Sequence, residues 1–179
     1  MIARRVFLAT GLALAGVGRR LRAQTADPSP PVRYAPLARP VTIPLDAVAV
    51  PWQPVPFVAE GTRSDGAAAP KREARRRVLI NGVLFRTDTH LSALCVTCPH
   101  EQCQVDLVTD ESRLARMIDG KASHPLFECA CHLSVFDAGA DGARISGETP
   151  RGLYRFRIAG TRDAIVEINE IEEAALSEV

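Results

Sequence analysis

Cysteine and histidine residues are concentrated in one part of this 179-residue chain, and they constrain its fold more than any other feature. All five cysteines lie between positions 95 and 131, and His100 and His132 adjoin them. Such clustering is typical of a metal site, whereas a disulfide scaffold spreads its cysteines along the chain. The sequence therefore predicts a fold that is organised around a metal centre.

Two short motifs contain these residues. The first is Cys98-Pro99-His100-Glu101-Gln102-Cys103, and the second is Cys129-Ala130-Cys131-His132-Leu133-Ser134. Each motif offers one cysteine and one histidine within a single tight loop, so together they supply two thiolates and two imidazoles. A mononuclear zinc site with two cysteines and two histidines explains these four donors. It leaves Cys103 and Cys131 without a role.

The C-x-H and C-x-x-H spacings resemble those of the Rieske family, in which two histidines replace two cysteines on one iron of a 2Fe–2S cluster. The resemblance extends over residues 78–168 and includes the loop 147–150. The cluster ligands that it implies are Cys98, His100, Cys129 and His132. Ser134 matches the family serine that donates a hydrogen bond to a cluster sulfide.

The two remaining cysteines of the motifs also match this family. In its high-potential branch, a cysteine at each of these positions forms a disulfide that ties the two cluster loops together. The resemblance thus implies a Cys103–Cys131 disulfide, which requires an oxidising compartment. Cys95 is left over, and it alternates with apolar residues in the segment 91–96. We expect a buried structural thiol there.

The first 24 residues have the pattern of a targeting segment. Arg4-Arg5-Val6-Phe7-Leu8 resembles a twin-arginine signal, and the run 6–18 is mainly apolar. Thirteen residues extend only about 20 Å as a helix, which is short of the hydrocarbon core of a membrane at about 30 Å. We expect a signal that is cleaved or retained as a short anchor, and a location in the periplasm or at the periplasmic face of the inner membrane.

The distribution of charge argues against a nucleic-acid binder. The formal net charge is +1, but the first 23 residues hold five arginines and no acidic residue, which leaves −4 for the remainder. A domain that binds nucleic acid normally carries a basic patch on its folded part. The basic run at the end of the segment 61–77 is expected to be a solvated loop or a docking patch.

The rest of the chain predicts β-structure. The Pro-rich segment 25–56 favours extended backbone with short edge strands at 41–45 and 48–50 at most. Asn81-Gly82 predicts a hairpin turn. Further strands are expected at residues 83–87, 91–96, 126–127, 135–136, 153–158 and 165–168. We expect an all-β fold, a small antiparallel sandwich or barrel with a cluster-binding subdomain.

One short helix is predicted between the motifs, since Leu114, Met117 and Ile118 share a helical face and Asp110 or Ser112 offers an N-cap. Gly120 is expected to end this helix. It is either a tolerated insertion or a docking element, because the gap between the motifs is longer than usual for the family. The expected organisation is a signal at 1–24, an extended leader at 25–56, a Rieske domain at 57–170 with its cluster-binding part at 95–150, and an acidic tail at 171–179.

Several positions depart from the family pattern. Respiratory members usually have Leu-Gly where this chain has Glu101-Gln102, and a charged residue there disfavours contact with quinol. Leu133 stands where glycine is usual. Phe136 replaces a tyrosine of the high-potential members, which predicts a lower reduction potential than theirs. His90 and His124 are expected in a turn and a loop, outside the metal site.

The function that the resemblance implies is electron transfer. We expect a subunit of a membrane or periplasmic redox complex that relays electrons between a quinol pool or a redox enzyme and a c-type cytochrome. The alternative context is the small Rieske subunit of a molybdenum oxidoreductase such as arsenite oxidase. A Rieske oxygenase is disfavoured, because its catalytic domain needs far more than 179 residues. A zinc-stabilised binding module is the third class.

Overall fold

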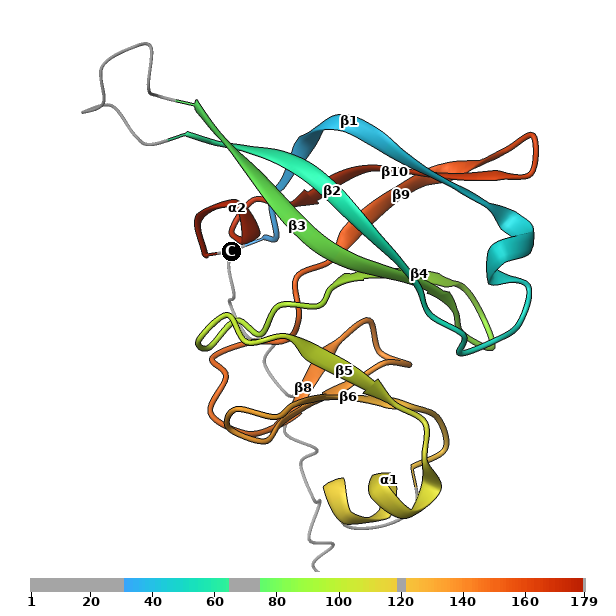
Figure 1. The fold of residues 1–179 in the computed structure, drawn as a ribbon, viewed down its shortest axis with the longest axis vertical. Helices are drawn as coiled ribbons and strands as arrows, with labels where there is room; N and C mark the ends of the chain where they lie inside the picture. The colour runs from blue at the N-terminus through green and yellow to red at the C-terminus, as the bar shows by residue number, and fades with distance from the viewer. Residues whose placement is uncertain (1–30, 65–74, 119–121, 179) are drawn as a thin grey trace, which may run out of the picture. The chain divides into compact units, whose positions relative to one another are not determined.

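A computed structural model describes residues 31–64, 75–118 and 122–178, and the proposed signal at 1–24 lies outside them. These residues form three antiparallel sheets with little helix (Figure 1), which confirms the expected all-β class. The first sheet has the order β1-β10-β9, with bounds Tyr34–Pro44, Ile165–Glu172 and Phe156–Arg162. The second has the order β2-β3-β4, with bounds Val55–Ser64, Arg75–Arg86 and Leu91–Cys95.

The third sheet carries both cysteine–histidine motifs at its loops. Its order is β5-β6-β7-β8, with bounds Val105–Val108, Leu126–Cys129, Ser134–Asp137 and Ala143–Ser146. Three short helices complete the fold: η1 at Leu45–Val48, a 3-10 helix, α1 at Glu111–Met117 and α2 at Ala175–Glu178. Among the described residues, none of the helices has the length and apolar character needed to cross a membrane.

The Pro-rich segment forms a longer strand than its composition predicts. β1 runs from Tyr34 to Pro44 and pairs with β10, with a break in register between Pro36 and Val41. β1 lies at the edge of its sheet. An edge strand tolerates proline, because a residue whose N–H would face solvent needs no donor for the sheet. The strand expected at 48–50 is absent, since Val48 ends the helix η1.

The prediction of a turn at Asn81-Gly82 is wrong. Both residues lie inside β3 and pair with Val58 and Phe57 of β2. Gly82 is required there by close packing, because a Cβ atom on it would lie 2.4 Å from the ring of Phe57. A glycine inside a strand often marks such a close approach rather than a turn.

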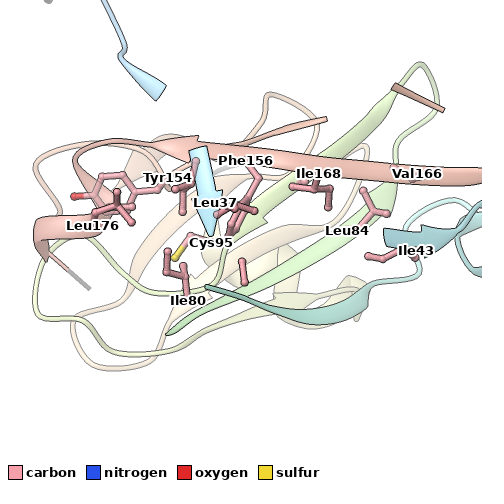
Figure 2. Close-up of a cluster of buried hydrophobic side chains, with 14 of the residues drawn as sticks. Leu37, Ile43, Ile80, Leu84, Cys95, Tyr154, Phe156, Val166, Ile168 and Leu176 are labelled. Atoms are coloured by element: carbon pink, nitrogen blue, oxygen red, sulfur yellow. The ribbon is translucent and has the colours of Figure 1, made fainter. Parts of the chain in front are cut away.

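The main apolar core lies between the first and second sheets. Figure 2 shows its side chains, which come from both sheets and include Ile80 and Leu84 of β3 and Ile168 of β10. Cys95 belongs to this core and is fully buried, as expected. Burial raises the pKa of its thiol, and a hydrogen bond with Thr97 opposes that increase.

The third sheet, β5-β6-β7-β8, has apolar residues on both faces, because successive side chains of a strand alternate. Phe127 and Phe136 lie on the face that packs against Phe85 of the second sheet. Leu126 and Val135 lie in a separate cluster that contains Leu114 of α1. The sheet is therefore a layer between the body of the domain and the short helix.

The helix α1 forms as predicted and Asp110 caps it, but it ends at Met117, and Ile118, expected on its helical face, has extended backbone. The Asp110 carboxylate accepts a hydrogen bond from the backbone N–H of Arg113 at 2.8 Å. The Ser112 hydroxyl and that amide lower the pKa of Asp110, since both stabilise the charged form. Gly120, which was expected to end the helix, lies outside the described residues.

The C-terminal residues pack against the body instead of extending as a tail. β10 continues to Glu172, and the side chains of Ala175 and Leu176 in α2 are buried. Residues 171–178 therefore contribute to the core despite their acidic composition.

Candidate metal centre

The two motifs form loops at the same end of neighbouring strands. The first follows β4 and is closed by hydrogen bonds from the N–H of Cys98 to the carbonyl of Cys103 (2.8 Å) and from the N–H of Gln102 to the carbonyl of Cys98 (3.0 Å). The second is the hairpin between β6 and β7, in which Cys129 pairs with Ser134. Backbone hydrogen bonds within the first loop and strand pairing at the base of the second therefore define the shape of each loop.

The structure brings the four predicted ligands together as two like pairs. Cys98 and Cys129 are buried free thiols that interact with each other. The rings of His100 and His132 lie edge to face with centroids 4.7 Å apart. The disulfide between Cys103 and Cys131 joins the two loops, with a Cα–Cα distance of 6.5 Å. The predicted disulfide is confirmed.

The surroundings of Cys98 suit a metal-bound sulfur. Burial raises the pKa of its thiol, and the nearby Cys129 raises it further. The backbone N–H groups of His100 and Glu101 donate toward the Cys98 sulfur and oppose that increase. A metal ion supplies the positive charge that a buried thiolate needs, since a coordinated thiol is deprotonated outright.

Two buried polar atoms of this site have no hydrogen-bond partner among the described residues: Nδ1 of His100 and Oγ of Ser134. Leaving such an atom unsatisfied costs about 1–3 kcal/mol, so each one in a native structure calls for an explanation. An imidazole nitrogen that binds iron and a hydroxyl that donates to a cluster sulfide account for both atoms. The donor set therefore fits a 2Fe–2S cluster.

Gly147 packs directly behind Ser134. Its φ of +96° lies in a region that favours glycine, and a Cβ atom there would lie 2.5 Å from the Ser134 hydroxyl. The loop 147–150, singled out in the sequence, thus holds the serine against the cluster loops.

Comparison with known families matches residues 58–157 to the Rieske [2Fe-2S] domain, a range that includes both motifs. The chain belongs to the Rieske family. Membership implies a Rieske 2Fe–2S cluster as the cofactor, and electron transfer as the function of the domain. No curated protein matches the chain at a significant level.

The position of Glu101 distinguishes this Rieske site. Its carboxylate lies 3.8 Å from Nε2 of His132, and its side chain is 62% exposed. Sequence reasoning identified Glu101 only as a departure from the family pattern. It missed the contact because Glu101 and His132 belong to different motifs, and only the approach of the two loops brings them together.

Both Rieske loops contain a non-glycine residue in the left-handed region. Gln102 has φ of 59° and Leu133 has φ of 53°. Only glycine adopts this conformation without a steric cost. These are the two positions at which the family usually has glycine, so the loops keep the glycine conformation although the glycines have been replaced.

The other two histidines make structural contacts away from the Rieske site. Nε2 of His90 lies 3.1 Å from the carboxylate of Asp141, and Nε2 of His124 lies 2.6 Å from that of Asp137. The ring of His124 also stacks on Trp52 at 5.4 Å. These contacts agree with the turn and loop roles expected for both residues.

Proposed function

We propose that this protein is an electron-transfer subunit in which two thiolates and two imidazoles hold the cluster. The proposed ligands are Cys98, His100, Cys129 and His132. The observation that carries the proposal is the pairing of two buried thiols and two imidazole rings across disulfide-linked loops, within the matched Rieske domain.

A Rieske cluster supplies a one-electron couple with a potential of about −150 to +300 mV, well above the value of about −400 mV for plant-type ferredoxins. The protein contributes the environment of that couple. The buried thiols of Cys98 and Cys129 keep the sulfur side away from water. The Ser134 hydroxyl, which has no hydrogen-bond partner among the described residues, would donate to a cluster sulfide and thereby favour reduction. The side chain of His132 is 35% exposed, so a redox partner would reach the cluster at the histidine side.

The partner proposed for this site is a membrane or periplasmic redox complex together with a c-type cytochrome. A location in the periplasm, or at the periplasmic face of the inner membrane, is supported by the disulfide, since such bonds persist in oxidising compartments. Glu101 disfavours direct contact with quinol, because its exposed carboxylate stands beside His132. That feature favours the small Rieske subunit of a molybdenum oxidoreductase such as arsenite oxidase over the subunit of a cytochrome bc-type complex.

Metal analysis and electron paramagnetic resonance of the reduced protein test the cofactor and its ligands. We expect about two irons and two labile sulfides per chain, and loss of the signal in Cys98→Ser, Cys129→Ser, His100→Ala and His132→Ala. Cys95→Ser is the matched control, because it removes a buried thiol that lies in the main core. A single zinc ion per chain would refute the proposal.

The proposed location has a separate test. We expect that changing Arg4→Lys and Arg5→Lys together retains the protein in the cytoplasm, since a twin-arginine signal depends on both residues. Cell fractionation with immunodetection measures the distribution. Export of this variant at the rate of the unaltered protein would contradict the twin-arginine assignment and leave the cluster assignment standing.

A further inference from the structure

A groove of about 380 Å³ lies between α1 and the second cluster loop, and its lining includes Leu133, the residue that follows the proposed ligand His132 in the chain. Its floor is the face of the third sheet that packs against α1, and α1, seen next to β6 in Figure 1, forms one wall. Its lining residues are Arg113, Arg116 and Met117 of α1, Glu128, Val135 and Ser146 of the sheet, and Leu133 of the second motif. The inserted helix thus creates a surface feature next to the cluster loop.

Leu133 links this groove to the site of electron exit. It directly follows His132 in the chain, and it is 66% exposed. Its left-handed backbone, with φ of 53°, carries a steric cost that glycine would avoid. Together with Met117, which lines the same groove, Leu133 offers apolar contact area among polar groups.

The charges around the groove are mainly positive. Arg113 donates from Nε to the Glu128 carboxylate at 3.0 Å, and its Nη2 contacts the same oxygen, so the acidic residue of the floor is neutralised. Arg116 lines the same wall and makes no ion pair among the described residues. The charged residues that line the groove, two arginines and one glutamate, therefore sum to +1.

Further acidic residues lie at the start of α1, where the Ser112 hydroxyl, the Arg113 amide and the charge of Arg116 together lower the pKa of Asp110. Asp110 and Glu111, at the start of α1, line a different hollow. Glu101 contacts His132 from the first motif and does not line the groove. His132 therefore has a negative charge on the side of the first motif and a positive groove on the side of the second. Such an arrangement orients an approaching charged partner.

We propose that this groove docks an acidic electron-transfer protein, with carboxylates of the partner facing Arg116 and an apolar residue of the partner contacting Leu133 and Met117. This inference rests on the proposed electron-transfer function. Docking there places the partner beside His132 and needs no rearrangement of the cluster loops. The negative charge of Glu101 disfavours an orientation that brings the carboxylates of the partner to the first motif.

Stopped-flow oxidation of the reduced holoprotein tests this proposal. The small probes are ferricyanide, a trianion, and tris(phenanthroline)cobalt(III), a trication. The protein probes are plastocyanin, which is acidic, and a basic mitochondrial-type cytochrome c. The test variant is Arg116→Glu. The control is Arg162→Glu, which changes the net charge equally at an exposed position in the β9–β10 hairpin.

We expect Arg116→Glu to slow oxidation by ferricyanide and by plastocyanin about threefold to tenfold at low ionic strength, and to accelerate oxidation by the cobalt complex, because reversing a charge within a Debye length changes attraction into repulsion. The control variant should change these rates less than twofold. The difference should disappear at about 1 M salt, where the Debye length is about 3 Å.

A second variant separates docking from simple electrostatic attraction. Leu133→Asn keeps the left-handed backbone accessible, since asparagine tolerates it. It should slow the reaction with plastocyanin and leave the reaction with ferricyanide unchanged. Equal effects of Arg116→Glu and Arg162→Glu, or an unchanged plastocyanin rate in Leu133→Asn, would overturn the docking proposal. Absence of the reduced-cluster signal in the unaltered protein would instead refute the proposed function itself.

Discussion

Glu172 is the buried charge on which we expect the stability of this domain to depend most. It ends β10, it is 1% exposed, and its carboxylate accepts hydrogen bonds from Nη2 of Arg151 and from Nε of Arg155, the latter at 2.6 Å. Glu172 in turn raises the pKa of Arg155. Both arginines belong to the segment that follows the loop 147–150. The ion pairs therefore connect the main core to the loop that supports Ser134.

The perturbation is Glu172→Gln, which keeps the volume of the side chain and removes its charge. Breaking a buried ion pair by neutralising one partner costs about 3–5 kcal/mol. The side chains of Arg151 and Arg155 are 34% and 39% exposed, so water stabilises part of their unpaired charge. We therefore expect a loss of about 2–3 kcal/mol in the free energy of unfolding.

The matched control is Glu170→Gln in the same strand. Glu170 pairs with Arg157 at 2.5 Å, but the two side chains are 29% and 53% exposed. An exposed ion pair contributes about 0–1 kcal/mol. The two variants thus make the same chemical change two residues apart and differ in burial.

Thermal unfolding of the oxidised holoprotein, followed by circular dichroism at a fixed scan rate, measures the difference. A loss of about 2–3 kcal/mol should lower Tm by about 10 °C for a domain of this size, and the control by less than about 4 °C. Equal shifts for the two variants would show that burial does not determine the contribution of Glu172, and would refute the reasoning.

Three further predictions concern the cluster loops. Replacing Cys103 and Cys131 by serine removes a bridge with a sequence separation of 28 residues. This should destabilise the domain by about 3–4 kcal/mol in urea unfolding, and reducing the unaltered protein should reproduce the effect; an unchanged urea midpoint would contradict it. Phe136→Tyr adds a hydroxyl on the strand face shared with Ser134, and voltammetry should show a raised reduction potential, whereas an unchanged or lowered value would refute the idea. Gly147→Ala places a methyl group 2.5 Å from the Ser134 hydroxyl. It should therefore lower the reduction potential or reduce the cluster content. Unchanged values of both would show that the loop moves without displacing Ser134.

The local parts of the structure could be predicted from the sequence. The two motifs indicate their donor atoms because cysteine and histidine coordinate metals through their own side chains, whatever the rest of the chain does. The capped helix at Glu111–Met117 and the strand at Leu91–Cys95 follow from local patterns of capping and alternation. The resemblance carried by the motifs also implied the disulfide that the structure contains.

The sequence-based prediction was wrong where long-range packing determines the backbone conformation. Asn81-Gly82 has the pattern of a turn, but ten paired residues of β2 hold it inside β3. Local preference contributes about 1 kcal/mol at such a position, and the burial of a whole strand outweighs it.

The two sequence motifs by themselves determined which residues can bind the cluster, because the ability to coordinate a metal is a property of individual cysteine and histidine side chains. Only the tertiary structure decided how those residues are used. It placed Glu101 against His132, buried Glu172 between two arginines, and set α1 beside Leu133 to form the groove. Each of these contacts joins segments that are distant in the sequence or belong to different loops. Their geometry therefore depends on the packing of the sheets, which no local pattern records.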